Sequence, residues 1–75
     1  MKNTFFLKHH NKTIKIVTEL KEIDPIIGPT IQRWFAWVEE NTTIRGIADT
    51  EMEALEKCKR SIRNIPAELL HQYVK

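Results

Sequence analysis

The stretch that decides the fold runs from Arg33 to Ile62 and reads RWFAWVEENTTIRGIADTEMEALEKCKRSI. It opens with Trp34 to Val38, a run of aromatic and β-branched side chains that is typical of a central β-strand. Polar residues at 39–42 then favour a turn, and residues 43–48 can run back as a second strand. Asp49-Thr50 ends that strand, so we expect a helix to begin there.

The start of this helix carries a specific signal. Thr50 and Glu53 form the pattern of a capping box, in which each side chain satisfies a backbone N–H group at the helix start. Acidic residues lead and basic residues follow, as the helix dipole favours, and the spacing predicts i,i+4 ion pairs between Glu53 and Lys57 and between Glu56 and Arg60. Apolar residues recur every three or four positions and predict one stripe that packs on a sheet: Met52, Leu55, Cys58, Ile62 and Ile65.

Length and composition predict one small domain that spans residues 1–75. The chain is 41% hydrophobic and 29% charged, which is ordinary for a globular protein, and its net charge of +2 is low for a dedicated nucleic-acid binder. A single cysteine cannot form an internal disulfide, and no apolar run reaches the roughly 20 residues of a membrane span. The N-terminus meets charge again at Lys8 and so does not continue as a secretory signal. We expect a cytoplasmic protein.

The N-terminal third predicts a hairpin. Alternating residues at 13–20 and the apolar residues at 4–8 read as two strands, and the polar segment from His9 to Lys12 favours a tight turn because its Asn can adopt positive φ. Lys21 to Pro29 contains two prolines and a glycine and is expected to be the longest loop. Ile26 and Ile27 within it are expected either to form a lid over the core or to contact a partner.

The sequence therefore predicts an α+β fold, in which a small antiparallel sheet of three to four strands packs on one amphipathic helix. Pro66 is suited to the first position of a short C-terminal helix with recurring apolar residues. The expected strands are residues 4–8, 13–20, 31–39 and 43–48, and the expected helices are residues 50–63 and 66–74.

The aromatic strand has two apolar faces. Alternation places Trp34, Ala36 and Val38 on one face and Phe35 and Trp37 on the other, and one helix can cover only one of them. The second face is therefore either covered by the loop or tail or free to bind a partner. Aromatic residues and Arg dominate protein interfaces, so the expected partner-binding residues are Arg33, Phe35, Trp37, Ile26 and Ile27.

Motifs for catalysis are missing from the sequence. It contains no Gly-rich phosphate loop, and the adjacent pair Glu39-Glu40 should point apart. His9-His10 and His71 lack further ligands at metal-binding spacing, and Cys58 lies on the apolar helix stripe, where a free cysteine behaves as a small hydrophobic residue. We expect no enzymatic activity, no cofactor and no bound metal.

The pattern W-x-A-x-V from Trp34, followed by a polar loop and I-x-G-x-A-D-T-x-x-E-A-L-x-x-C-K-x-x-I, resembles the N-terminal domain of HicB-type antitoxins over roughly 30 residues. The resemblance implies a three-stranded sheet on one helix that begins at an Ala-Asp-Thr turn, here residues 48–50. Asn41-Thr42-Thr43 replaces the Pro-Gly-rich loop of that family, and the DNA-binding domain that most such antitoxins carry is missing from these 75 residues. The role implied by the resemblance is therefore protein binding.

These observations predict a non-enzymatic interaction module, an antitoxin-like or mobile-element-encoded inhibitor whose partner is a toxin or host factor. A homodimer is also expected, because the terminal helix and the second strand face offer more apolar surface than one helix covers. The alternative is a small nucleic-acid binder similar to double-stranded-RNA-binding proteins, although acid at the helix start disfavours phosphate. Its residues would be Lys8, Lys12, Lys15, Lys57, Lys59, Arg60 and Arg63.

Overall fold

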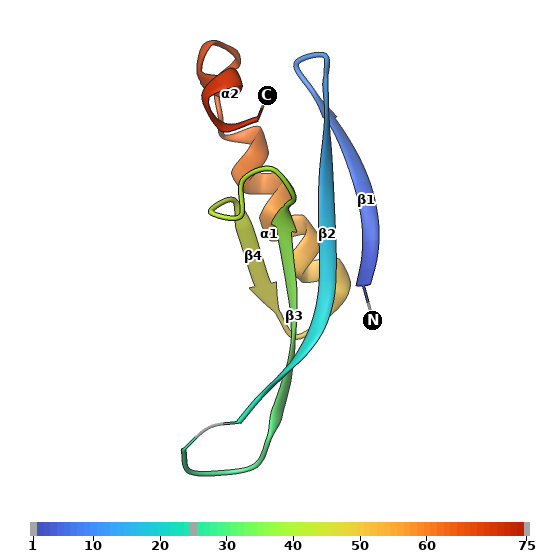
Figure 1. Ribbon diagram of the computed structural model, residues 1–75, viewed down its shortest axis with the longest axis vertical. Coiled ribbons are helices and arrows are strands. Elements are labelled where there is room, and N and C mark those ends of the chain that lie inside the picture. Colours follow the sequence, from blue (N-terminus) through green and yellow to red (C-terminus); the bar gives the residue numbers. More distant parts are fainter. Residues whose placement is uncertain (1, 25, 75) are drawn as a thin grey trace.

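The structure, a computed structural model, describes residues 2–24 and 26–74 and confirms the α+β class. Four antiparallel strands form one sheet in the order β1-β2-β3-β4, and two helices follow them in the chain (Figure 1). The elements are β1 (Lys2–His9), β2 (Lys12–Ile23), β3 (Ile31–Val38), β4 (Arg45–Ala48), α1 (Glu51–Arg63) and α2 (Ala67–Tyr73).

The predicted N-terminal hairpin is confirmed. Its two-residue turn consists of His10 and Asn11, whose φ angles of 49° and 65° match the turn that suits the right-handed twist of paired strands. The register runs without a break from His9 opposite Lys12 to Lys2 opposite Glu19. The conformation of His10 and Asn11 therefore sets the register between β1 and β2.

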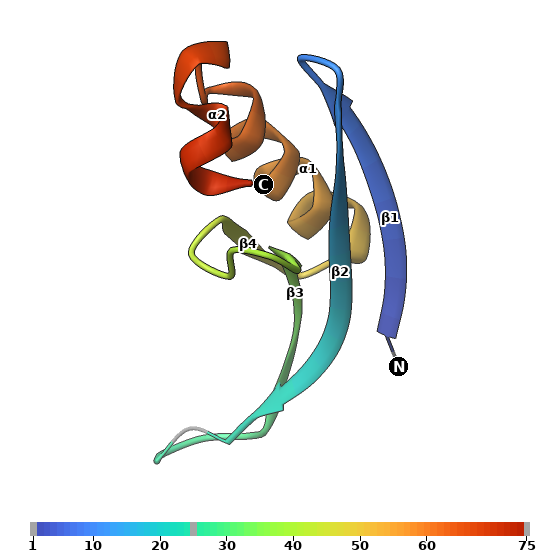
Figure 2. The same ribbon diagram turned by 45° about the horizontal axis from the view of Figure 1, so that its top comes forward.

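The second strand is longer than predicted. We expected it to end at Leu20, but it pairs with β3 as far as Ile23, which lies opposite Ile31. Strand β1 begins at Lys2, opposite Glu19, and β4 ends at Ala48, opposite Trp34. Beyond Leu20 and Trp34 the β2–β3 ladder therefore has no flanking strand among the described residues. This two-stranded extension, residues 21–24 and 26–33, is named the arm, and Figures 1 and 2 show it projecting from the rest of the sheet.

The other element boundaries shift by one or two residues. Strand β4 begins at Arg45 and not at residue 43, because the backbone N–H of Ile44 donates to the Asn41 carbonyl at 3.1 Å and closes a turn. Thr50 is the N-cap of α1 and lies outside the helix, and its hydroxyl accepts from the Glu53 N–H at 3.2 Å, as the capping pattern predicts. Pro66 is likewise the N-cap of α2 and not its first residue.

The core lies between α1 and one face of the sheet. Ile14 and Ile16 of β2 and Ala36 and Val38 of β3 are buried there, as alternation predicts, together with side chains of α1: Ala54, Leu55, Cys58 and Ile62. The predicted helix stripe was wrong at one position, since Met52 is 69% exposed. Ala54 takes its place because the buried stripe lies on the other side of Leu55 from Met52.

A close contact between α1 and β4 explains the small residue at position 46. A Cβ atom on Gly46 would lie 2.5 Å from the Ala54 carbonyl oxygen and 2.9 Å from the Cys58 nitrogen, both backbone atoms of α1. The glycine therefore allows the helix to lie directly on the edge strand. This requirement is one of packing distance and not of backbone conformation.

The short helix α2 closes one end of the core. Leu70 and Val74 are buried in the same cluster as the α1 side chains. The Lys12 ammonium donates to the Val74 carbonyl at 2.9 Å, and the Asn41 amide donates to the Tyr73 carbonyl at 3.3 Å, so the end of α2 is held by β2 and by the loop between β3 and β4. Neither described helix combines the length and apolarity that crossing a membrane requires.

Candidate interaction surface

One face of the sheet has no helix on it. Both helices pack on the face that carries Ile14 and Ala36, so the side chains that alternate with these residues point the other way. This surface is named the open face, and Figure 2 shows both helices on the opposite side of the strands. Its apolar residues are Phe6, Val17, Phe35, Trp37 and Ile47.

The cross-strand register gathers these side chains. Val17 of β2 lies opposite Trp37, and Phe35 lies opposite Ile47 of β4. Cross-strand neighbours on one face are close enough for direct contact, so the residues of three adjacent strands form one apolar patch. The sequence left two possibilities for this face: cover by the loop or tail, or binding of a partner. The terminal segment does not cover it, because Leu70 and Val74 lie in the core on the other side of the sheet.

A hollow lies beside the two aromatic residues. Its lining comes from Lys21, Phe35, Trp37, Thr42 and Arg45. The Lys21 ammonium lies 5.1 Å from the centre of the Phe35 ring and 5.3 Å from that of Trp37, within range of a cation–π interaction. The hollow therefore combines aromatic surface with two positive charges and contains no carboxylate in its described lining.

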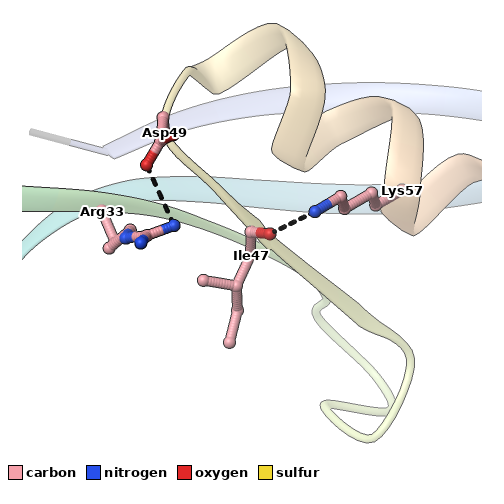
Figure 3. Close-up of polar contacts among 4 residues, drawn as sticks. All are labelled: Arg33, Ile47, Asp49 and Lys57. Atoms are coloured by element: carbon pink, nitrogen blue, oxygen red, sulfur yellow. Dashed lines mark hydrogen bonds and ion pairs between the residues drawn. The ribbon is translucent and has the colours of Figure 1, made fainter.

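The open face carries an excess of positive charge. Arg33 pairs with Asp49 at 2.9 Å (Figure 3), Lys15 with Glu39 at 2.8 Å and Lys21 with Glu19 at 3.7 Å. The members of these pairs are exposed to solvent, apart from the half-buried Glu19, so each pair is weak. The other cations of this face have no ion pair among the described residues: Lys2, Lys8 and Arg45.

The arm continues this surface away from the domain. Ile23 and Ile31 alternate in phase with Lys21 and Arg33, so the open-face side of the β2–β3 ladder ends in a pair of isoleucines. Beyond them Ile26 and Ile27 are 102% and 90% exposed. The predicted lid over the core is therefore wrong, because a lid would bury these side chains. The arm carries two cations and two carboxylates, and its apolar tip is uncovered.

The five predicted partner-binding residues lie along one ladder. Arg33, Phe35 and Trp37 are on the open-face side of β3, while Ile26 and Ile27 are at the tip of the arm that extends it. Sequence reasoning missed Ile23, Ile31 and Ile47. The alternation of the two long strands contained the signal for the first two. The assumption of a loop from Lys21 to Pro29 concealed Ile23, whereas Ile31 lay within the predicted strand and was overlooked.

The seven residues named for nucleic-acid binding do not form one surface. Lys8 and Lys15 are on the open face, whereas the Lys12 ammonium turns to the Val74 carbonyl on the opposite side. The remaining four lie on α1: Lys57, Lys59, Arg60 and Arg63. A nucleic acid that contacts all seven would have to reach both faces of the sheet.

Two side chains of reactive types, Cys58 and His9, lie away from the open face. Cys58 is fully buried, and desolvation raises the pKa of its thiol to about 11, which agrees with its expected place in the core. The Nε2 atom of His9 lies 3.1 Å from the Ile65 carbonyl oxygen and is used in the contact between β1 and the end of α1. Both side chains therefore take part in packing contacts within the domain.

Comparison of the chain with protein-family models, with curated proteins and with solved structures yields no match. The resemblance to HicB-type antitoxins stays a prediction from the residues between Trp34 and Ile62.

Proposed function

We propose that the protein is a non-enzymatic binding module that holds another protein against its open face and arm. The observation that carries the proposal is a continuous apolar surface along the β2–β3 ladder, named the strip. It runs from the patch around Phe35 and Trp37 to four exposed isoleucines: Ile23, Ile26, Ile27 and Ile31. Exposed apolar surface of this kind marks interaction sites in soluble proteins, and aromatic residues are the commonest hot spots.

The charge of the strip indicates the chemistry of the partner. Lys21, Arg33 and Arg45 flank the aromatic patch, while the arm tip is aliphatic. A complementary protein surface presents carboxylates around an apolar anchor and offers an apolar pocket to the tip. Ile26 and Ile27 favour a protein over a nucleic acid, because aliphatic side chains give no stacking surface for bases.

In the form that the HicB resemblance favours, the bound protein is a toxin and binding inhibits it. A host factor bound by a mobile-element-encoded inhibitor uses the same surface and the same chemistry. The two forms differ in the partner's activity, so an assay of that activity with increasing amounts of this protein separates them.

The test uses the full chain to isolate its partner and then measures the purified complex. Trp37→Ala is expected to weaken binding roughly thirtyfold, since truncating a hot-spot aromatic costs about 2 kcal/mol or more. Met52→Ala is the matched control, because Met52 is an exposed apolar residue on α1, away from the open face. Melting temperatures of both variants verify that the fold is intact.

Two results would contradict the proposal. In the first, Met52→Ala weakens the complex as much as Trp37→Ala, which places the partner on the helices. In the second, the retained molecule is single-stranded nucleic acid, whose affinity falls steeply as salt rises and which uses Trp37 and Phe35 for stacking.

A further inference from the structure

A second hollow lies at the outer edge of β4 and shares Arg45 with the aromatic hollow on the open face. Strand β4 contributes Arg45, Gly46 and Ile47, and helix α1 contributes Lys57, Arg60 and Ser61. The described lining thus contains three cations and a hydroxyl and no carboxylate.

The packing of α1 on Gly46 brings these cations together. Because the helix backbone lies against the glycine, the Lys57 ammonium reaches the Ile47 carbonyl of the edge strand at 3.0 Å (Figure 3). That bond uses one of the three ammonium protons and leaves two for another acceptor. Lys57 is therefore fixed at the hollow and still able to donate.

The carboxylates predicted to neutralise this part of α1 do not do so. Glu56 was expected to pair with Arg60 but lies 4.0 Å from Lys59. Among the described residues, neither Arg45 nor Arg60 forms an ion pair, and Lys57 bonds a carbonyl where Glu53 was expected. Three like charges around one hollow repel one another, and a bound anion would relieve that repulsion.

We propose that this hollow binds a phosphate group. Arginine presents a planar fork of donors that matches phosphate oxygens, and lysine supplies a compact charge. The Ser61 hydroxyl lines the hollow but already donates to the Lys57 carbonyl at 3.2 Å, so the three cations supply the donors. The hollow lies toward the C-terminal half of α1, where the helix dipole is negative and disfavours anions. Binding therefore depends on the side chains, and the loss of one cation is expected to have a large effect.

Free phosphate and a nucleoside monophosphate share this chemistry. Arg45 lines both this hollow and the aromatic hollow on the open face, so a ligand held here through its phosphate lies next to aromatic surface. The two sources are distinguished by Trp37, which can stack with the base of a nucleotide, whereas free phosphate has no ring to stack on.

The experiment is a titration of the isotope-labelled full chain with inorganic phosphate at constant ionic strength, followed by amide chemical shifts. Saturable shifts are expected at residues 45–47 and 57–61. Arg60→Gln and Arg45→Gln are each expected to weaken binding about tenfold, the effect of losing a hydrogen bond to a charged group. Arg63→Gln removes the same charge from the same helix outside the hollow and is expected to leave binding unchanged.

Equal weakening by Arg63→Gln would overturn the proposal, because net charge alone would then explain the effect. Shifts that do not saturate, or that chloride reproduces, would also overturn it. A parallel titration with adenosine monophosphate identifies the source: tighter binding that Trp37→Ala reduces to the level of inorganic phosphate indicates a nucleotide, and equal binding indicates free phosphate. Both of these outcomes support the site.

Discussion

At the scale of single residues, Gly46 joins the sheet to the helix. The backbone of α1 lies so close that an added Cβ atom would be 2.5 Å from the Ala54 carbonyl oxygen. Backbone atoms of a packed helix cannot rotate away as the end of a side chain can. The helix must therefore move away from β4 to admit even one methyl group.

The Gly46→Ala variant is accordingly expected to lose about 1–3 kcal/mol of stability through overpacking. For a domain of this size, each 1 kcal/mol corresponds to about 4–8 °C in melting temperature. Thermal unfolding followed by circular dichroism measures the loss. An unchanged melting temperature would mean that α1 does not lie against β4 at this distance.

A second residue-scale contact fixes the start of α1. The Glu51 carboxylate accepts from the hydroxyl of Thr18, which is fully buried, and from the amide of Asn3. One acidic side chain thus satisfies a buried polar group of β2 and connects α1 to both strands of the N-terminal hairpin.

Replacing Glu51 by Ala is expected to destabilise the fold by about 2–3 kcal/mol, because a buried hydroxyl loses its acceptor and two charge-assisted hydrogen bonds are lost. Glu53→Ala is the control, since it removes the same charge from the same helix turn without contacting Thr18. Urea denaturation of the two variants should separate them, and equal losses would mean that helix charge alone is responsible.

The buried thiol of Cys58 predicts a pH dependence. Its pKa is raised to about 11 by desolvation, whereas in the unfolded chain it returns to its ordinary value near 9.0. Between these values the unfolded state binds fewer protons than the folded state, so stability is expected to fall as pH rises from 9 to 11.

The decline is measured by urea denaturation at several alkaline pH values and compared with the same series for Cys58→Ala. The alanine variant lacks the thiol and is expected to show a smaller decline, although it starts from a lower stability because a core atom is lost. Parallel declines in the two proteins would contradict the assigned pKa.

At the scale of elements, the arm is the part of the sheet that contributes no side chain to the core. Ile23 and Ile31 form the outermost pair of its ladder, and among the described residues no third strand supports the ladder from Lys21 and Arg33 outward. A two-stranded ribbon is marginally stable alone. Its four isoleucines are exposed and therefore add little to the stability of the folded monomer.

The tip of the arm, beyond the Ile23–Ile31 pair, is therefore expected to be removable. Joining Ile23 directly to Ile31 through Asn-Gly uses the same kind of two-residue turn that closes the β1–β2 hairpin. Stability is expected to change by less than about 0.5 kcal/mol, as for substitutions away from the core, while partner affinity falls at least tenfold. Unchanged affinity would restrict the binding surface to the sheet.

At the scale of the whole molecule, the predicted homodimer can be assigned to one surface. Leu70 and Val74 of the terminal segment are buried within the chain, so deleting that segment would open the core and would not test an interface. The open face and arm carry six of the nine exposed large apolar side chains among the described residues, whereas α2 exposes Leu69 and Tyr73. We therefore expect a second copy to bind at the open face, where self-association would compete with the protein partner.

Light scattering over a hundredfold range of concentration is expected to show a dimer that Phe35→Lys converts to a monomer, because a buried lysine at a two-fold interface faces its own symmetry copy. Met52→Lys is the control on the helix side of the domain. A parent protein that is monomeric throughout this range would contradict the predicted homodimer.

The sequence alone determined the features that depend on neighbours along the chain. Thr50 and Glu53 predicted the start of α1, the Asn in the first turn predicted the hairpin, and alternation divided Trp34 from Phe35 correctly. Each of these depends on contacts within a few residues, where spacing fixes geometry. Of the expected partner-binding residues, Arg33, Phe35 and Trp37 followed from the same alternation, whereas Ile26 and Ile27 followed from their apolar character in a predicted loop. The role of all five is a proposal.

Tertiary structure decided the features that depend on distant segments. The close approach at Gly46 selects Ala54 over Met52 as the buried position, because the helix surface that meets β4 must be small. Pairing with β3 carries β2 past Leu20 to Ile23 and turns a predicted loop into the arm. The Thr18–Glu51 hydrogen bond joins residues 33 positions apart. Such contacts form only when distant segments are packed together, so local patterns in the sequence do not fix them.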